Sequence, residues 1–243
     1  MKDTVFTLKE NKKIAKNTYE WVLEGDTSGI TASGQFVNIK LDGFFLRRPI
    51  SVCDVRENNL VLIFKAVGAG TEKMAEAKPG ERFDVLTGLG NGYDLSLSGK
   101  SPLLIGGGAG VPPMFMLAKE LISGGAKPTV ILGFGSSDEV FYKEEFEKIG
   151  ARVLITTVDG SYGIRGFVTN AMADLEYTYF YTCGPEPMLK AVYDASSTSG
   201  QFSFEERMGC GFGACMGCTC KTKYGNKRIC REGPVLVKEE IIW

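Results

Sequence analysis

Residues 102–125 read "PLLIGGGAGVPPMFMLAKELISGG" and decide the fold of the second half of the chain. The apolar run at 102–105 predicts a buried strand, and the glycines at 106–110 predict a tight turn. The stretch from residue 111 predicts a helix, because proline is tolerated in a first helical turn and glycine commonly ends a helix. A strand, a glycine turn and a helix in this order are the unit of a parallel α/β sheet.

The same alternation continues toward the C-terminus. "PTVILGFG" (128–135) predicts a strand that leads into a helix at 139–150, and "RVLITTVDG" (152–160) predicts the next strand. "YTYFYTCGP" (177–185) is interpreted as the last strand of the unit, followed by a helix in 186–200. Parallel strands joined by crossover helices are expected, so residues 99–200 are interpreted as a nucleotide-binding α/β domain.

The chain has a different character on either side of this unit. Residues 1–98 hold short alternating segments such as "NTYEWVLEG" and "GQFVNIKL", separated by Gly, Asn and Asp turns. They predict an antiparallel β-barrel, because closure resolves the edges of many short strands. Residues 201–243 are rich in glycine and cysteine and have too little apolar sequence to fold without something to fold around. They are interpreted as a small third segment.

Composition excludes several classes of partner. The 243 residues have a formal net charge of -1, so no broad basic field exists to hold nucleic acid or an acidic membrane. The N-terminus has no apolar signal region, and no run reaches the roughly 18 apolar residues that a membrane span needs. A cytoplasmic protein with a small-molecule or protein partner is therefore expected.

Five of the seven cysteines lie in "CGFGACMGCTCKTKYGNKRIC" (210–230). Cys210, Cys215 and Cys218 are separated by four and then two residues, which is the plant-type iron–sulfur spacing, and Cys230 is available as a fourth thiolate. The glycines between them favour a loop that wraps a cluster with its N–H groups turned toward sulfur. The segment therefore predicts a [2Fe–2S] centre.

Other readings of the cysteines remain open. An odd number of cysteines in a reducing compartment disfavours disulfides. A structural zinc site more often has two pairs of ligands with two residues inside each pair, whereas here only Cys215 and Cys218 form such a pair and the chain has no histidine. The absence of histidine also excludes a Rieske centre. Either Cys218 or Cys220 could be the third ligand, because both face one side of an extended segment, and the two-residue gap after Cys215 favours Cys218.

Glycine turns suggest nucleotide sites. The turn that contains Gly106, Gly107, Gly108 and Gly110 brings a helix N-terminus close to a ligand, although Pro113 stands where the standard dinucleotide motif has a third glycine. A plain tight turn is the alternative. Cys183, Gly184 and Pro185 follow a predicted strand at the edge of the sheet where ligands bind. The alternative for Cys183 is a buried small hydrophobe.

The first half holds a second candidate anion site. In "FFLRRPISV" a proline-held strand would aim an arginine at a phosphate, unless the two arginines are simply solvated. "FKAVGAGTEKMAEAKPG" runs through Gly70 to Thr71, which is expected to cap a helix that begins there. Together with the α/β unit, these features suggest that the protein binds two nucleotides.

The combination of "RRPIS", "GAGT", "LGNGY", "GGGAGVPP" and "CGPEPM" resembles the ferredoxin–NADP reductase superfamily over nearly the whole chain. In that superfamily a barrel domain holds FAD and an α/β domain holds a nicotinamide nucleotide. The cysteine segment and "TTVDGSYGIRGFVT" resemble the electron-transfer subunits of two-subunit, NAD-linked dihydroorotate dehydrogenases. The resemblance implies FAD, a [2Fe–2S] cluster and NAD as cofactors.

The resemblance also implies roles for particular residues. The flavin and its phosphates would be bound by Arg48, Pro49, Ile50 and Ser51, with Ile63, Phe64 and Lys65 along the flavin and Gly70 and Thr71 at the pyrophosphate. Many relatives have tyrosine at the position of Ile50, which leaves open which side chain covers the flavin. Cys183 would lie near the nicotinamide ring, and the loop 133–138 would hold more of the nucleotide. Asp138 in that loop would repel a 2′-phosphate.

The chain shows no constellation for acid–base or nucleophilic work on an organic substrate, so its chemistry would be that of its cofactors. By the resemblance, electrons would come from an FMN-containing dihydroorotate dehydrogenase catalytic subunit and leave to NAD, in a heterotetramer of two such pairs. Two alternatives stay open. One is a flavin and iron–sulfur NAD(P)H oxidoreductase subunit that serves a sulfide- or ferredoxin-linked partner. The other is a zinc-bound interaction module without enzymatic activity.

Overall fold

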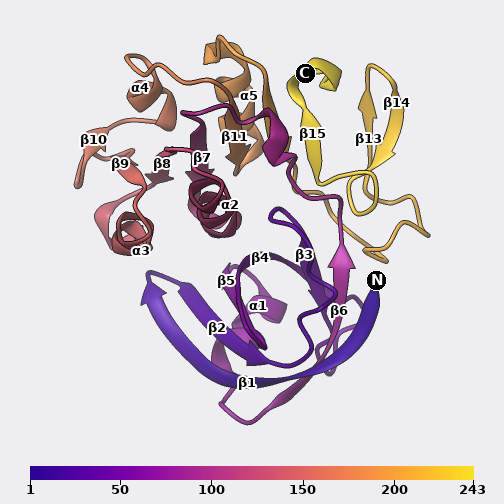
Figure 1. Ribbon diagram of the computed structural model, residues 1–243. Coiled ribbons are helices and arrows are strands. Elements are labelled where there is room, and N and C mark those ends of the chain that lie inside the picture. The colour runs from indigo at the N-terminus through magenta and orange to yellow at the C-terminus, as the bar shows by residue number, and fades with distance from the viewer.

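The computed structural model describes residues 1–243 and contains a closed β-barrel, a seven-stranded sheet and a two-stranded hairpin (Figure 1). The barrel is formed by the first half of the chain, and the sheet lies above it in the view of Figure 1. The predicted fold class, a barrel followed by a parallel α/β unit and a small C-terminal segment, is confirmed.

The barrel is antiparallel and its strands pair in the order β1-β2-β5-β4-β3-β6. The strands are β1 (Lys2–Ala15), β2 (Thr18–Glu24), β3 (Phe36–Ile39), β4 (Arg48–Arg56), β5 (Asn59–Lys65) and β6 (Arg82–Leu89). Alternating side chains such as Phe6 and Leu8 on β1 and Trp21 on β2 fill its interior. The helix α1 (Ala69–Glu76) connects β5 to β6 and buries Met74 in the same core.

The sheet has the strand order β10-β9-β8-β7-β11-β12-β15, and every pair is parallel except the last. Its strands are β7 (Leu103–Gly107), β8 (Thr129–Phe134), β9 (Arg152–Thr157), β10 (Ile164–Arg165), β11 (Phe180–Cys183), β12 (Gly200–Ser203) and β15 (Val235–Val237). Short 3-10 turns are η1 (Leu95–Leu97), η2 (Gly108–Gly110), η3 (Ser137–Glu139) and η4 (Lys238–Glu240).

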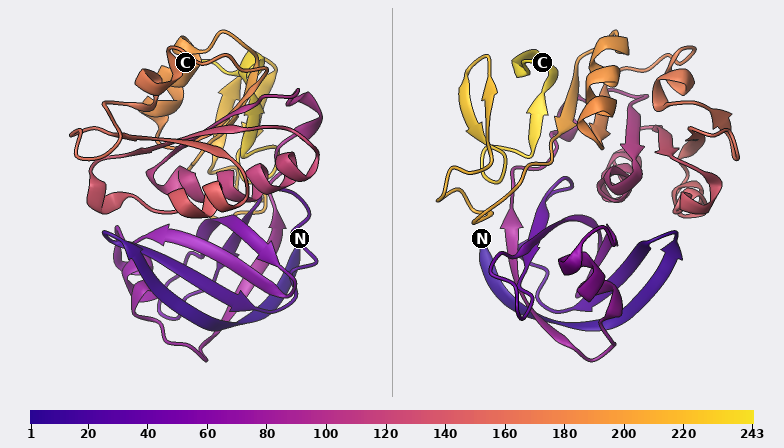
Figure 2. Two further views of the ribbon diagram at one scale, coloured as in Figure 1. Left: turned by 60° about the vertical axis from the view of Figure 1, so that its left-hand side comes forward. Right: turned by 180° about the vertical axis from the view of Figure 1, so that it is seen from behind.

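Helices cover both faces of this sheet (Figure 2). The helices α2 (Val111–Ser123) and α3 (Lys143–Lys148) lie on the face toward the barrel. The helices α4 (Val168–Met172) and α5 (Glu186–Ala195) lie on the opposite face. The longest helix, α2, has 13 residues, and no helix combines the length and the hydropathy needed to cross a membrane.

Polar contacts hold the barrel against the sheet. Asp54 on β4 is buried and accepts hydrogen bonds from Lys119 of α2 at 2.5 Å and from Arg56 at 2.8 Å. Tyr142 donates to Glu20 of β2 at 2.6 Å. Barrel and α/β side chains also share one hydrophobic cluster. These contacts fix the two units next to each other, so cavities between them are defined.

The last two strands of the sheet correct the sequence analysis, which interpreted residues 177–185 as the last strand of the unit. Residues after Gly200 supply two more strands: β12 pairs parallel to β11, and β15 pairs antiparallel to β12. The C-terminal segment therefore does not fold only around a bound group, because part of it belongs to the sheet. The hairpin β13 (Thr219–Thr222) and β14 (Gly225–Arg228) is joined to the C-terminus through a bridge between Thr222 and Ile241.

Two helix starts also differ from the prediction. The helix predicted at 139–150 begins only at Lys143, because Tyr142 takes a left-handed conformation with φ 65° that no regular helix continues. Thr71 was expected to cap α1, but Gly68 is the N-cap and Thr71 lies in the first turn. The Thr71 hydroxyl accepts a hydrogen bond from the N–H of Val67 at 3.0 Å and thereby still fixes the start of the helix.

Candidate functional site

A cavity of about 300 Å³ lies where the barrel meets the α/β unit, and we name it the flavin cavity after the ligand that the sequence predicts for it. Seven residues that the sequence analysis assigned to the flavin line it: Pro49, Ile50, Ser51, Ile63, Phe64, Lys65 and Thr71. They come from neighbouring antiparallel strands, β4 and β5, and from the start of α1. Two segments that are separate in sequence therefore form one wall, as a flavin site on the barrel requires.

Arg48 and α1 together form an anion site at one end of this wall. A Cβ atom on Gly70 would lie 2.0 Å from Nε of Arg48, so only glycine lets the guanidinium approach the first turn of α1. Arg48 donates to the backbone carbonyl of Leu46 at 2.6 Å, and it has no carboxylate partner. A cation without an anion, beside free N–H groups at a helix N-terminus, fits a pyrophosphate.

The rest of the lining of the flavin cavity consists of residues that the sequence analysis did not assign to it. These residues are Phe36, Val67, Ala109, Ser203, Phe204, Glu205, Glu206, Met208 and Pro234. Most of them follow β12 in the C-terminal segment, where no periodic pattern marks a lining residue. The flavin cavity is thus shared between the barrel and the segment that carries the cysteines.

A second cavity of about 600 Å³ opens at the carboxyl edge of the parallel sheet. Gly107, Gly108 and Pro185, which the sequence analysis assigned to the nucleotide, line it. Further lining residues lie at the ends of β8 and β9, follow β8, β9 and β10, or belong to α4 and α5: Gly133, Phe134, Gly135, Glu139, Thr156, Val158, Gly166, Phe167, Val168, Thr169, Pro187, Met188 and Ala191. The loop in "TTVDGSYGIRGFVT" was quoted as a motif without a role, and the structure brings its two ends to this cavity.

Gly106, Gly110 and Gly184 do not line this second cavity. A Cβ atom on Gly110 would lie 2.1 Å from the carbonyl oxygen of Cys183, and one on Gly106 would lie 2.9 Å from Cα of Val111. These two glycines let α2 begin close to β7 and β11. They therefore contribute to a nucleotide site indirectly, because they fix where α2 begins and where Gly107 and Gly108 lie just before it.

Replacing Gly110 by alanine should consequently damage both stability and nucleotide binding. The added methyl group meets rigid backbone, so α2 must shift, and we expect a loss of about 1–3 kcal/mol in the free energy of unfolding. The rate of flavin reduction by NADH should fall with it. Gly124→Ala is the matched control at the other end of α2, because its Cβ would meet nothing closer than 3.4 Å. Urea titration and stopped-flow absorbance measure the two effects, and equal behaviour of both variants would refute the steric argument.

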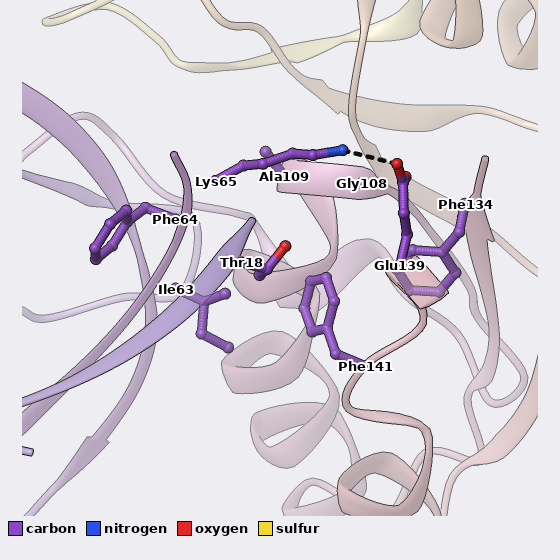
Figure 3. A pocket seen from close by; sticks show the side chains of 9 residues that line it. All are labelled: Thr18, Ile63, Phe64, Lys65, Gly108, Ala109, Phe134, Glu139 and Phe141. Carbon is purple, nitrogen blue, oxygen red and sulfur yellow. Dashed lines mark hydrogen bonds and ion pairs between the residues drawn. The ribbon is translucent and has the colours of Figure 1, made fainter. Parts of the chain in front are cut away.

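The two cavities meet in the narrow space of Figure 3, where Lys65 and Ala109 line both of them. Lys65 extends from β5 and forms an ion pair with Glu139 of η3, with 3.1 Å between Nζ and Oε1. Ile63 and Phe141 face this space from the barrel and from the loop before α3. A nicotinamide in one cavity and a flavin in the other would therefore approach each other here.

Two further residues of the sequence analysis, Cys183 and Asp138, are also absent from the linings of these cavities. Cys183 is 1% exposed and packs with Tyr93 and Tyr181, and burial raises the pKa of its thiol. It lies at the end of β11, two residues before the lining residue Pro185 and not among the lining residues themselves. Asp138 faces the barrel, where its carboxylate pairs with Lys16 at 3.0 Å. A hydrogen bond from Ser136 and this ion pair lower the pKa of Asp138.

The cysteine loop brings its thiols together as two pairs. The N–H of Cys210 lies 3.4 Å from Sγ of Cys215, and the N–H of Cys215 lies 3.5 Å from Sγ of Cys210. The N–H of Cys230 lies 3.4 Å from Sγ of Cys218. No group of three or more Cys, Asp or Glu side chains is arranged to hold a single metal ion. Two pairs of thiols fit a binuclear cluster, whose irons each take two thiolates, better than one zinc ion.

Backbone N–H groups favour the thiolate form of Cys210. Partial burial raises the pKa of Cys210, but N–H groups of Cys215, Phe212 and Ala214 outweigh it and lower the pKa to about 6. The hydrogen bond from Ala214 to Sγ of Cys210 is 3.2 Å long. Thiolates are the form that binds iron, so the loop fits an iron–sulfur cluster before any metal is present.

Cys220 takes part in neither pair, although it packs against the same hydrophobic cluster as Cys218 and Cys230. It is on the strand β13, where it pairs with Lys227 of β14, and its side chain lines a different cavity behind the loop. Cys218 precedes β13 and is 2% exposed next to Cys230. The two cysteines that the sequence left as alternatives are therefore in different environments.

The cysteine loop adjoins the flavin cavity. Cys218 and Cys230 belong to a hydrophobic cluster that contains Phe36, with Met208 packed against it. Phe36 and Met208 also line the flavin cavity. Phe36 and Met208 thus belong both to the lining of the flavin cavity and to the packing around Cys218 and Cys230.

A barrel with a flavin-sized cavity, an adjoining nucleotide cavity and a cysteine loop define a flavin-dependent oxidoreductase of the ferredoxin–NADP reductase type. Comparison with known proteins agrees. Residues 104–194 match the family model "Oxidoreductase NAD-binding domain", and residues 205–242 match "Iron-sulfur cluster binding domain of dihydroorotate dehydrogenase B". A solved NADH-dependent reduced ferredoxin–NADP oxidoreductase has a TM-score of 0.89 and 28% identity, covering 98% of this chain and 90% of that one.

Relatives that match over nearly their full length identify the family. A "Dihydroorotate dehydrogenase B (NAD(+)), electron transfer subunit" of Fusobacterium nucleatum is 44% identical, covering 97% of this chain and 96% of the relative. The protein of that name from Bacillus pumilus is 42% identical, covering 99% and 98%. The chain belongs to the family of dihydroorotate dehydrogenase B (NAD(+)) electron transfer subunits.

Membership confirms several predictions. The resemblance seen in the sequence is confirmed, and so are the class of NAD-linked flavin and iron–sulfur oxidoreductase subunit and the cofactor set of FAD, [2Fe–2S] and NAD. The family name also implies that a catalytic partner subunit exists. The residues that hold each cofactor and the division at residues 98 and 200 stay predictions.

Proposed function

We propose that this chain is the electron-transfer subunit of a cytoplasmic, NAD-dependent dihydroorotate dehydrogenase of pyrimidine biosynthesis. It would take electrons from FMN in a catalytic partner subunit and pass them through its [2Fe–2S] cluster and FAD to NAD. The observation that supports this proposal most is the position of the cysteine loop, which adjoins the flavin cavity through Phe36 and Met208 and reaches the surface at Cys215.

We assign the cluster to Cys210, Cys215, Cys218 and Cys230, with Cys220 as a free thiol. The arrangement as two thiol pairs and the separate position of Cys220 support this assignment. We assign the flavin to the 300 Å³ cavity, with its pyrophosphate at Arg48 and the first turn of α1. When bound, FAD would accept electrons singly from the cluster and give a hydride to the nicotinamide, which links a one-electron cluster to a two-electron carrier.

The protein's own residues would hold the nicotinamide nucleotide in the 600 Å³ cavity. Gly107 and Gly108 let a pyrophosphate approach the start of α2. Lys65 and Glu139 are the only charged residues that line the cavity, and they neutralise each other. A 2′-phosphate would find no unpaired cation among the lining residues, which supports NAD over NADP.

The surface around the cysteine loop would bind the catalytic partner, and we propose a heterotetramer of two such pairs. Phe212 is 42% exposed and Met216 is 54% exposed, on either side of the exposed Cys215. Apolar side chains around an exposed redox centre fit a surface that a protein partner covers. Electrons would then cross the subunit interface at the loop itself.

Replacing Phe212 and Met216 by glutamate should weaken this association. Two buried charges in an interface cost several kcal/mol, so we expect the dissociation constant of the two subunits to rise at least about a hundredfold. The cluster spectrum should not change, because neither side chain is a ligand. Val5→Glu is the control, since Val5 is 51% exposed on the barrel strand β1. Analytical ultracentrifugation of the mixed subunits measures the effect, and wild-type association of the double variant would exclude this surface.

A second candidate function is an oxidoreductase that exchanges electrons with ferredoxin. The similarity in fold to the NADH-dependent reduced ferredoxin–NADP oxidoreductase favours it. Two assays of the purified chain separate the candidates: reduction of NAD by dihydroorotate with an added FMN subunit, and exchange of electrons between NADH and ferredoxin. Activity only in the second assay would favour the ferredoxin-linked function.

A further inference from the structure

Asn38 lies at the junction between the flavin-binding barrel and the cysteine loop. It is on β3, and its side chain is 1% exposed. Its Nδ2 donates a hydrogen bond to the carbonyl oxygen of Cys210 at 3.3 Å. No other side chain of the barrel strands donates a hydrogen bond to this loop. The contact therefore joins a flavin-side strand directly to the first cysteine of the predicted cluster.

The loop is shaped to receive this side chain. Gly211 follows Cys210 and has φ +78°, which L side chains rarely adopt. A Cβ atom on Gly211 would lie 2.3 Å from Nδ2 of Asn38. Both the conformation and the close approach require glycine here. The backbone of the loop thus rests on the amide of Asn38.

The same strand also touches the flavin cavity. Phe36 is two residues before Asn38, so both side chains leave β3 on the same side. Phe36 lines the flavin cavity and packs in one cluster with Cys218 and Cys230. Asn38 is opposite Pro49 of β4, which also lines the flavin cavity. A shift of the loop relative to β3 would change its position relative to the flavin.

An asparagine at this place is costly for the fold. Its Oδ1 is buried and has no hydrogen-bond partner. An unpaired buried acceptor destabilises the folded state, so an apolar side chain of the same shape would pack there at a lower cost. The side-chain amide has one favourable orientation. If it were flipped, Oδ1 would face the carbonyl oxygen of Cys210, and the two oxygens would repel each other. Packing therefore does not explain why asparagine stands here, whereas the hydrogen bond that its Nδ2 donates to Cys210 does.

We propose that Asn38 is a positioning residue that holds the cysteine loop on β3 and thereby sets the rate of electron transfer between flavin and cluster. The proposal rests on the proposed function, which supplies the electrons. The tests run the proposed path in reverse. NADH would supply two electrons through FAD and be oxidised to NAD, and the cluster would accept one of them while the other would remain with FAD.

Three variants of the full chain test the role of the donor. Asn38→Leu keeps the shape and removes the donor, Asn38→Asp removes the donor and adds a charge, and Asn38→His restores an N–H donor. In the first two we expect normal iron and FAD contents and flavin reduction by NADH within about twofold of wild type, because the nicotinamide cavity is elsewhere. Cluster reduction should slow about tenfold or more, as is common when a supporting contact of a metal site is lost.

Two further readouts separate positioning from general damage. The paramagnetic resonance spectrum of the reduced cluster should change in Asn38→Leu and Asn38→Asp and should return toward wild type in Asn38→His. Amide hydrogen exchange in residues 209–217 of the iron-free protein should be faster in the first two variants. Wild-type cluster reduction together with wild-type exchange in both would overturn the proposal.

The remaining outcomes are also decisive. Should Asn38→Leu purify without iron, the iron content of Asn38→His decides. A hydrogen bond that holds the loop predicts that Asn38→His contains iron, and an Asn38→His protein without iron contradicts the proposal. If NADH does not reduce the wild-type cluster, the proposed function fails, and hydrogen exchange still decides whether Asn38 holds the loop.

Discussion

Replacing Cys218 by serine is expected to remove the visible iron–sulfur absorbance and to abolish electron transfer from the partner, while Cys220→Ser changes neither. Cys218 is 2% exposed and its sulfur lies 3.4 Å from the N–H of Cys230. Cys220 is on β13, and its side chain lines a separate cavity. A serine at position 218 leaves one iron with a poor ligand, because thiolates are the ligands that hold such clusters.

The flavin supplies an internal control for this pair of variants. Cys218→Ser should still bind FAD and oxidise NADH with an artificial dye, because the flavin and nucleotide cavities do not include Cys218. Absorbance, iron content and dye reduction are measured on the same preparations. An intact cluster in Cys218→Ser combined with its loss in Cys220→Ser would assign the third ligand to Cys220. Intact clusters in both would contradict the four-cysteine assignment.

Arg48→Ala should release FAD, and this is the second large effect that we expect. The guanidinium lies at the first turn of α1 beside Gly70 and has no carboxylate partner, so its charge is available to a phosphate. Charge-assisted hydrogen bonds contribute about 1.5–3 kcal/mol, which corresponds to an increase in the dissociation constant of FAD of roughly 10- to 100-fold. Fluorescence titration of the apoprotein with FAD measures it.

Arg47 is the matched control beside it. Arg47 forms an ion pair with Asp84 at 2.8 Å and also donates to the backbone carbonyl of Asp84. Arg47→Ala should therefore cost about 1 kcal/mol in the free energy of unfolding, as partly exposed pairs do, with little change in FAD affinity. If the two variants lost FAD equally, Arg48 would have no special role at the pyrophosphate.

The main elements of the fold could be predicted because their signals are local. The run at 102–125 combines an apolar strand, a glycine turn and a proline-started helix, and it became β7, η2 and α2. β12 and β15 could not be predicted this way, because each is only three or four residues long and is defined by its pairing with a distant strand. Which strand each of them pairs with depends on the tertiary structure and leaves no local pattern in the sequence.

The candidate site divides in the same manner. Pro49, Ser51 and Thr71 belong to short motifs and do line the flavin cavity. Phe36, Met208 and Asn38 follow no motif, because a single side chain that touches a distant loop leaves no pattern in the sequence. The choice between Cys218 and Cys220 was open for a related reason: both face one side of an extended segment, and only the start of β13 separates their environments.

The most direct test of the account is the coupled reaction of the two subunits. The purified chain, carrying FAD and its cluster, is mixed anaerobically with an FMN-containing catalytic subunit, and NADH formation from dihydroorotate and NAD is followed by absorbance. We predict NADH formation that requires both subunits and that disappears with Cys218→Ser in place of the wild-type chain. Two results would contradict electron transfer through this chain. One is NADH formation at the wild-type rate with a Cys218→Ser chain that lacks its cluster. The other is no NADH formation with a wild-type complex whose cofactors are complete.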